Sequence, residues 1–142
     1  MIITKLLQTS IEELLKIEKE IFPNPWKYED FHFMILNSDF NFLLKDKGKI
    51  IGYFCSLITG NIIHITNFAI VKKYQNKGIG YLFFNTLLQF FIKNNSPTFF
   101  LEVRKSNKKA IHLYKKLGFN IVKVIQNYYK QPKEDAFVMV KK

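Results

Sequence analysis

The alternation of apolar and polar residues along the chain predicts a mixture of strands and helices. Strands are expected over Ile2–Leu6, Phe40–Lys45, Ile50–Thr59, Ile62–Val71, Thr98–Val103, Ile121–Gln126 and Ala136–Lys141. Helices are expected over Ile11–Ile21, Lys27–Leu36, Gly80–Asn94 and Asn107–Leu117. Because the two kinds of element do not alternate strictly, we expect an α/β protein of the α+β type. Its mixed sheet would be flanked by helices, and a doubly wound parallel fold is less expected.

Local signals support the ends of these helices. Thr9 and Ser10 are each followed three residues later by a glutamate, a spacing typical of a capping box. The segment Phe22–Trp26 carries two prolines and is expected to end the first helix, since proline disfavours helical backbone in the residue before it. Gly118 follows the last helix, at a position where a positive φ costs a glycine little.

Length and composition indicate one domain over residues 1–142. A chain of 142 residues that is 48% hydrophobic can bury an extensive core, which excludes intrinsic disorder. No internal repeat or low-complexity linker divides the sequence. We therefore expect one compact unit.

The formal charge of +11 first suggests nucleic acid or an anionic membrane as a partner. Arg104 is the only arginine, however, so the planar fork that reads phosphates and guanine is scarce in this chain. The lysine surplus also fits an A/T-rich genome. We expect no required nucleic acid and no membrane partner, and no apolar run approaches the ~18 residues of a membrane span.

The remaining reactive residues indicate a reduced protein without a metal. Cys55 is the single cysteine and lies in an apolar strand, so a structural thiol is favoured over a nucleophile. His32, His64 and His112 lack the spacing of metal ligands and receive no role. The N-terminus lacks the order of a secretory signal, so a cytoplasmic location is expected.

The segment Gln75–Gly80 lies between a predicted strand and a long helix, a context typical of anion binding. Its glycines allow the backbone to bend and approach a ligand, and the helix behind it presents unpaired N–H groups. It is neither a Walker loop nor a complete dinucleotide fingerprint, because Phe83 stands where a third glycine would be. An ordinary turn with glycines for geometry alone remains the alternative.

Two motifs carry a resemblance to the GNAT acetyltransferases. Gln75–Gly80 is similar to the family's acetyl-CoA loop, Gln/Arg-x-x-Gly-x-Gly/Ala, and Asn107–Phe119 is similar to its second motif, Asn-x-x-Ala-x-x-x-Tyr-x-x-x-Gly-Phe. The resemblance implies the GNAT fold, with a mixed, mostly antiparallel sheet of about seven strands and about four flanking helices. It also implies acetyl-CoA as the co-substrate.

Further segments look like the bacterial ribosomal-protein alanine N-acetyltransferases of the RimI type. They are Phe22–Trp26, Asn67–Val71, Leu101–Asn107, Asn127–Tyr129 and Glu134–Ala136. Departures are Asn24, which lengthens the first turn, Asn76 and Lys77 in place of arginines, and Tyr81 in place of a basic residue. That branch acetylates the N-terminal α-amine of a ribosomal protein, S18 in its best-known members.

The resemblance assigns the catalytic roles to Glu102 and Tyr114. Glu102 would be the general base, acting through water, and Tyr114 the general acid that protonates the leaving thiolate. An α-amine, with a pKa of ~7.7–8.0, needs less help from a base than a lysine side chain at ~10.4. The alternatives are a Glu102 paired with Arg104 or a lysine, and a Tyr114 packed on its helix face.

The resemblance also assigns binding residues. Cofactor contacts are implied for Phe68, Ala69, Ile70, Gln75, Asn76, Lys77, Gly78, Ile79, Gly80, Tyr81 and Asn107, and acceptor contacts for Trp26, Tyr128 and Tyr129. At Phe68–Ile70 the main chain, freed by a bulge, would polarise the thioester. Asn107 could equally be only a helix cap, and the two tyrosines could simply pack on a strand.

These observations predict a cytoplasmic enzyme that acetylates a protein N-terminus, with the acceptor slot formed by loops at Pro23–Lys27 and Asn127–Lys133. The alternatives are acetylation of a small amine, a polyamine or an aminoglycoside, and a catalytically silent acyl-CoA-binding module. We expect a monomer or weak dimer. Because a ribosomal N-terminus is basic, Glu102, Glu134 and Asp135 are expected to make the acceptor side acidic.

Overall fold

A computed structural model describes residues 1–94 and 97–142 and forms a single seven-stranded sheet with the order β1-β2-β3-β4-β5-β7-β6. The strands are β1 (Ile2–Lys5), β2 (Phe42–Asp46), β3 (Lys49–Thr59), β4 (Ile62–Ile70), β5 (Thr98–Arg104), β6 (Asn120–Lys130) and β7 (Lys133–Lys141). The helices are α1 (Ile11–Ile21), α2 (Tyr28–Asn37), α3 (Ile79–Asn94) and α4 (Lys108–Lys116), with 3₁₀ turns at Gln8–Ser10 and Lys72–Tyr74. The expected GNAT-type α+β fold is confirmed.

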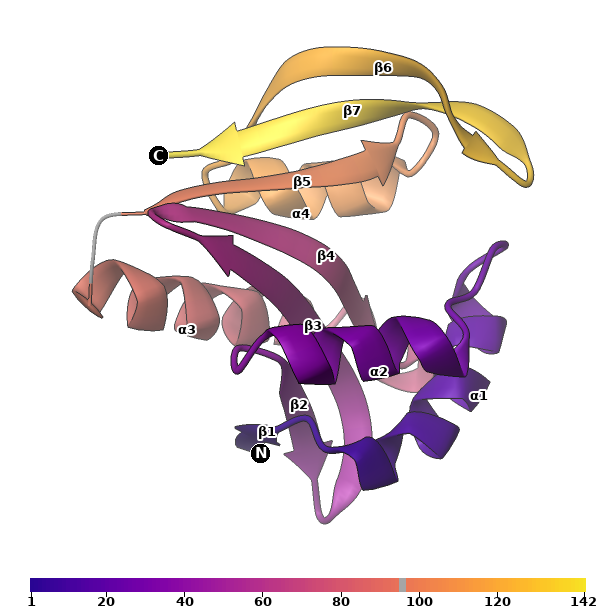
Figure 1. The fold of residues 1–142 in the computed structure, drawn as a ribbon, viewed down its shortest axis with the longest axis vertical. Coiled ribbons are helices and arrows are strands. Elements are labelled where there is room, and N and C mark those ends of the chain that lie inside the picture. Colours follow the sequence, from indigo (N-terminus) through magenta and orange to yellow (C-terminus); the bar gives the residue numbers. More distant parts are fainter. Residues whose placement is uncertain (95–96) are drawn as a thin grey trace.

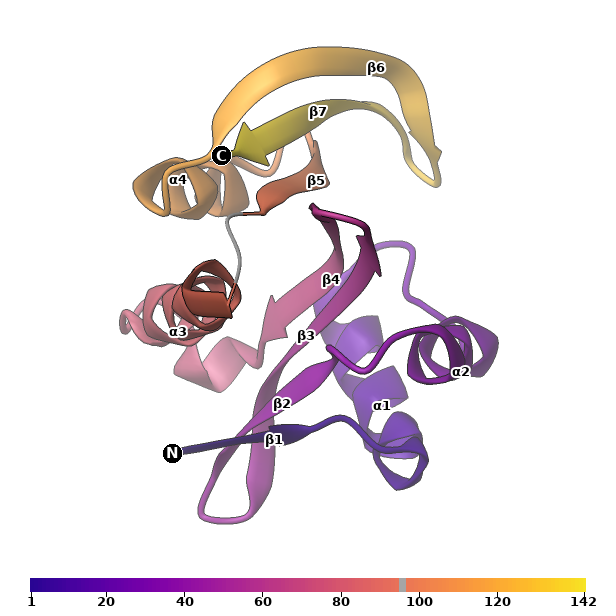
Figure 2. The same ribbon diagram turned by 60° about the vertical axis from the view of Figure 1, so that its left-hand side comes forward.

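The parallel pair β4–β5 is the feature of the sheet that creates a site. All other neighbouring strands are antiparallel, whereas β4 and β5 pair in parallel only over Ile62–His64 and Thr98–Phe100. Beyond His64 the two strands diverge, and Figures 1 and 2 show the sheet opening between them. The second halves of β4 and β5 are therefore not hydrogen-bonded to each other, and a gap opens between their backbones.

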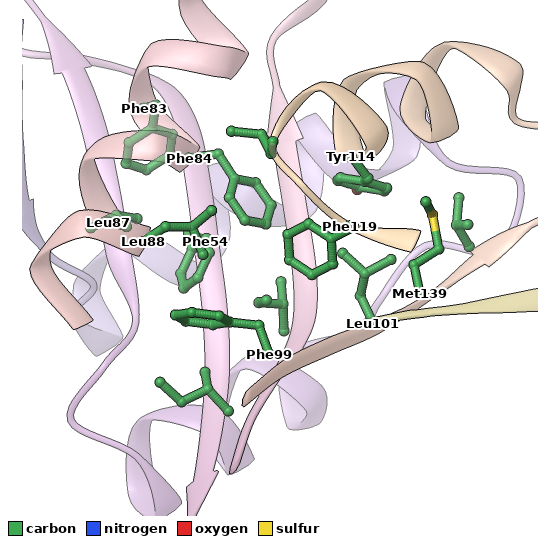
Figure 3. Packing of buried hydrophobic residues seen from close by; sticks show 14 of the residues in the cluster. Phe54, Phe83, Phe84, Leu87, Leu88, Phe99, Leu101, Tyr114, Phe119 and Met139 are labelled. Carbon is green, nitrogen blue, oxygen red and sulfur yellow. The ribbon is translucent and has the colours of Figure 1, made fainter. Parts of the chain in front are cut away.

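The helices cover both faces of the sheet, α1 and α2 on one face and α3 and α4 on the other (Figure 2). The alternation of side chains along β3 explains this arrangement, because Tyr53 and Cys55 join the cluster under α1 and α2. Phe54, between them, joins the cluster under α3 and α4, where it meets Phe84 edge to face at 5.3 Å. Figure 3 shows this second cluster, which also holds Phe99 and Phe119.

Two sequence predictions about element ends are wrong. Ser10 has helical backbone angles, φ −87° and ψ −15°, and its side chain makes no cap hydrogen bond, because Thr9 and Ser10 lie in the 3₁₀ turn that leads into α1. A capping side chain requires extended backbone at the cap, so the predicted capping boxes do not form. The final strands are also longer than predicted, and little of the expected acceptor loop Asn127–Lys133 remains outside them.

Other predictions are confirmed. The proline-containing segment after α1 forms the turn to α2, and Lys27 caps α2 with its N–H donated to Asp30 at 2.8 Å. Gly118 takes a φ of +100° after α4. Cys55 is fully buried, and burial raises the pKa of its thiol, as expected for a structural cysteine. Within residues 1–94 and 97–142, no helix has the length and apolar character needed to cross a membrane.

Candidate active site

A cleft of about 970 Å³ lies where β4 and β5 diverge. Its walls come from the α1–α2 turn, β4, β5, the loop before α3, the inner side of α4 and the end of β6. Of the site residues predicted from the sequence, all but Lys77 and Ile79 line it, so the fold gathers segments that are far apart along the chain. Lys77 instead lies over the ring of Tyr74, 6.0 Å from its centroid.

The loop Gln75–Gly78 forms one end of the cleft, at the N-terminus of α3. Asn76 and Gly78 take positive φ values of 63° and 79°, and the glycine makes that backbone path cheap. The Gln75 amide donates to Ile70 O at 2.7 Å and accepts from Lys109 Nζ at 2.7 Å, which ties the loop to β4 and α4. The N–H groups of the first turn of α3 have no intrahelical acceptor, so this end is suited to an anion.

Two lysines of α4 add positive charge at this end and were missed in the sequence. Lys109 bonds Gln75, and Lys116 lies over the Tyr81 ring at 4.9 Å from its centroid. Their spacing of seven residues places them on one helix face, which was the signal available in the sequence. Together with Lys72 they line the cleft and give its loop end a cationic character.

The β4 wall carries Phe68–Ile70 past the point where pairing with β5 ends at His64. The β3–β4 register shifts between Cys55 and Ser56, whose partners are Asn67 and Ile65, so Thr66 is an extra residue in the ladder. The bulge expected at Phe68–Ile70 therefore does not form there, because these residues pair in register with β3 and the irregularity lies at Thr66. The bulge at Thr66 twists β4 as the strand leaves β5.

Glu102, the predicted base, lies on β5 with its carboxylate 2.7 Å from His64 Nε2. The two side chains are 16% and 29% exposed, and the His64 ring is stacked on Phe100 at 4.2 Å. The alternative partner proposed from the sequence is wrong, because Arg104 pairs with Glu134 at 3.2 Å. His64 received no role from the sequence, and its contact with Glu102 was not anticipated. Parallel pairing of β4 and β5 brings it to Glu102, and nothing in the sequence gave that register.

Tyr114 is packed in the core and also lines the cleft, so its position is compatible with both alternatives left by the sequence. Its ring packs against Phe84 and Phe119 in the core, and Figure 3 shows it between α4 and these rings. The residue is 9% exposed, and it also lines the cleft. Burial, with a smaller contribution from Tyr129, raises the pKa of Tyr114 above its usual range. The phenol is therefore protonated throughout the neutral range and has a proton to donate.

Asn107 caps α4. Its side-chain oxygen accepts the Ala110 N–H at 3.2 Å, so the helix cap that the sequence left open as an alternative to cofactor binding does form. Asn107 also lines the cleft, so the residue that caps α4 is at the same time part of the cleft wall.

Tyr128 and Tyr129 lie on β6, not in a loop. Asn127, with φ 53°, forms a bulge before them, and their rings meet edge to face at 5.0 Å. The Arg104 guanidinium lies over the Tyr129 ring at 4.2 Å and donates to the carbonyls of Gln131 and Pro132. Both tyrosines line the cleft, and burial raises their pKa values, with the Glu102 charge contributing.

The acidic residues of the cleft differ from those expected. The Glu134 carboxylate accepts from Ser106 N–H at 2.6 Å and from Arg104, and hydrogen bonds from these two residues lower its pKa. Asp135 accepts the Asn127 N–H at 2.8 Å, and both carboxylates border a separate hollow beside α4. The carboxylates that line the cleft are Glu102 and Glu18, and Glu18 was not singled out from the sequence.

Diverging parallel strands, a glycine-containing loop at the start of a long helix, and a carboxylate and a phenol in the cleft lining are features expected of an acyl-CoA-dependent acyltransferase. Residues 8–119 match the sequence profile of the acetyltransferase (GNAT) family, and the chain belongs to that family. The protein is an acetyl-CoA-dependent N-acetyltransferase. Among the described residues, His, Cys, Asp and Glu form no group of three or more suited to a metal ion.

Individual relatives show which acetyltransferases the chain resembles. The chain is 31% identical over 139 residues to the ribosomal protein bS18-alanine N-acetyltransferase of Escherichia coli K12, covering 96% of this chain and 94% of that protein. It is 32% identical over 150 residues to an N-alpha-acetyltransferase of Sulfurisphaera tokodaii, covering 92% and 86%. The crystal structure of the ribosomal-protein-S18-alanine N-acetyltransferase from Escherichia coli superposes with a TM-score of 0.88 at 30% identity, covering 99% of this chain and 92% of that one.

Proposed function

We propose that this protein transfers the acetyl group of acetyl-CoA to the N-terminal α-amine of a protein, with the N-terminal alanine of a bS18-like ribosomal protein as the acceptor. The observation that carries the proposal is that one cleft holds both a cationic loop end and two carboxylates. Lys72, Lys109 and Lys116 lie at the loop end, Glu18 and Glu102 are the carboxylates of the lining, and Arg104 and Lys130 line the cleft as well. The relatives that act on protein α-amines support the same acceptor class.

The loop end fits the cofactor's anionic groups. Backbone N–H groups at the start of α3 and the α4 lysines would hold the phosphates, while Phe68–Ile70 would flank the thioester. Acetyl-CoA supplies the acetyl group and leaves as the free thiol. The Gln75 amide holds this geometry in place without any ligand, because both of its ends are already bonded within the protein.

The acceptor enters as an ammonium ion, and Glu102 with His64 takes one proton from it, through water. The His64 side chain is 29% exposed, so the pair can pass that proton to solvent. The amine lone pair then forms the new bond to the acetyl carbon while the carbon–sulfur bond breaks, and the nitrogen gives up its second proton through the same water to solvent, which leaves the neutral amide. Tyr114 donates its phenolic proton toward the leaving sulfur and regains a proton from solvent.

A thiol-release assay with acetyl-CoA and a panel of acceptors tests the proposal. Peptides that begin Ala-Arg should be acetylated, and the same peptides with a blocked N-terminus should not react. Turnover only on spermidine or only on blocked peptides would contradict the α-amine assignment. Binding of acetyl-CoA without thiol release for any acceptor would favour a silent binding module.

A further inference from the structure

Glu18 is a buried carboxylate that the proposed chemistry does not use. It lies in the last part of α1, is 1% exposed, and lines the cleft. Its two oxygens accept three hydrogen bonds: Trp26 N–H at 2.8 Å on Oε1, and Tyr53 OH at 2.6 Å and Asn67 Nδ2 at 2.8 Å on Oε2. A carboxylate this deeply buried is rare unless it is paired or has a function.

The three donors are all neutral groups. Hydrogen bonds from neutral donors stabilise a carboxylate but do not cancel its charge, so the negative potential persists where Glu18 borders the cleft. Its neighbours respond to that charge. Tyr53 and Cys55 have pKa values raised first by burial and then by the negative charge of Glu18.

The same three donors come from three different elements, two of which form the cleft wall. Trp26 belongs to the α1–α2 turn, and Asn67 immediately precedes Phe68 on β4, next to the bulge. Tyr53 lies on β3 opposite Ala69. Glu18 therefore ties the turn that carries Trp26 to the strand that carries Phe68–Ile70, and it does so where β4 no longer pairs with β5.

We propose that Glu18 is the positioning residue of the acceptor slot, a role that rests on the proposed function. Its hydrogen bonds hold the Trp26 turn against β4, and its charge, with that of Glu102, offsets Arg104 and Lys130 in the lining, so a cationic amine can enter before it loses its proton at Glu102. The slot thereby selects amines that arrive positively charged, and the cofactor end, built by α3 and α4, does not depend on Glu18.

The test compares Glu18→Gln with Glu20→Gln, a matched control that removes the same charge from an exposed position of the same helix. E18Q should raise the acceptor-peptide KM by about tenfold or more, since it removes the negative charge and weakens the hydrogen bonds that hold the Trp26 turn. The KM for acetyl-CoA should stay within about twofold. A merely structural role would lower the amount of active enzyme and change both constants little.

Asn67→Ala is a second variant that removes one tether and keeps the charge, and it decides the question if E18Q does not fold. It should also raise the acceptor KM selectively. Acceptor KM values within about twofold of the original in both variants, or parallel rises for acceptor and acetyl-CoA, would overturn the proposal.

Trp26 is the only tryptophan, so its emission reports on the slot without any turnover. The emission should shift in E18Q and remain unchanged in E20Q. An unshifted emission in E18Q would count against the tether. If the original protein acetylates only spermidine, the proposed function fails, whereas the comparison of variants, repeated with that cationic amine, still tests Glu18.

Discussion

Replacing Glu102 by glutamine tests the proposed base most sharply, because it removes the charge while nearly preserving the shape of the side chain. The Glu102 carboxylate contacts His64 at 2.7 Å and is only 16% exposed, so bulk water or buffer cannot readily take its place. A positioned general base contributes roughly 10²–10⁴-fold to a rate. We expect E102Q to lower kcat/KM for an α-amine peptide by about 100-fold or more at pH 7.

The pH dependence separates a lost base from a damaged site. With a pKa near 7.8, roughly 14% of an acceptor α-amine is unprotonated at pH 7 and roughly 94% at pH 9. Solvent therefore supplies about sevenfold more free amine at pH 9, and E102Q should regain about that factor. Initial rates of thiol release from pH 6.5 to 9.5 measure this, with Glu20→Gln as the control. A loss of less than about fivefold at pH 7, or no recovery at pH 9, would refute the role of Glu102.

Three further predictions concern Tyr114, the α4 cap and the buried ionisable groups. Tyr114→Phe should lower kcat by about tenfold or more and leave the KM for acetyl-CoA unchanged, since the phenol donates only as the thiolate leaves; unchanged turnover in steady-state kinetics would remove Tyr114 from the mechanism. Asn107→Ala loses the bond to Ala110 N–H and should destabilise the fold by ~1 kcal/mol in denaturant titrations; a large rise in the KM for acetyl-CoA would instead assign Asn107 to the cofactor. Stability should fall as pH rises above about 9, because the pKa values of Cys55 and Tyr53 are raised from 9.0 and 10.0, so the unfolded chain loses these protons first. Thermal melts from pH 8 to 11 measure this, and a constant melting temperature would contradict it.

Much of the fold could be predicted from local pattern. The helical spacing from Ile11 to Ile21 and the prolines after it predict the observed bounds of the first helix. Each of the seven strands predicted from the apolar pattern is present in the structure. The capping boxes failed because a hydrogen-bonding side chain at the right spacing does not determine backbone angles. The strand that carries Tyr128 continues across a bulge at Asn127, and short polar sequences of this kind read locally as loops.

In the site, residues that belong to contiguous motifs could be predicted from the sequence, and residues whose partners are distant in sequence could not. Residues held in contiguous motifs, such as the loop before α3, were placed correctly in the cleft. His64 and Glu18 were missed because their partners are 38 and up to 49 residues away in sequence. Only the parallel register of β4 and β5 brings His64 to Glu102, and only the packing of α1 on the sheet buries Glu18. A net charge of +11 gives no sign of the two carboxylates, Glu18 and Glu102, in the cleft lining.

The most direct test of the central claim is the position of the transferred acetyl group. A peptide that begins with alanine and contains an internal lysine offers an α-amine and an ε-amine in one molecule. After reaction with acetyl-CoA, fragmentation mass spectrometry should find one acetyl group, on the N-terminal residue. Acetylation of the lysine, or of neither amine while spermidine is acetylated, would contradict the account.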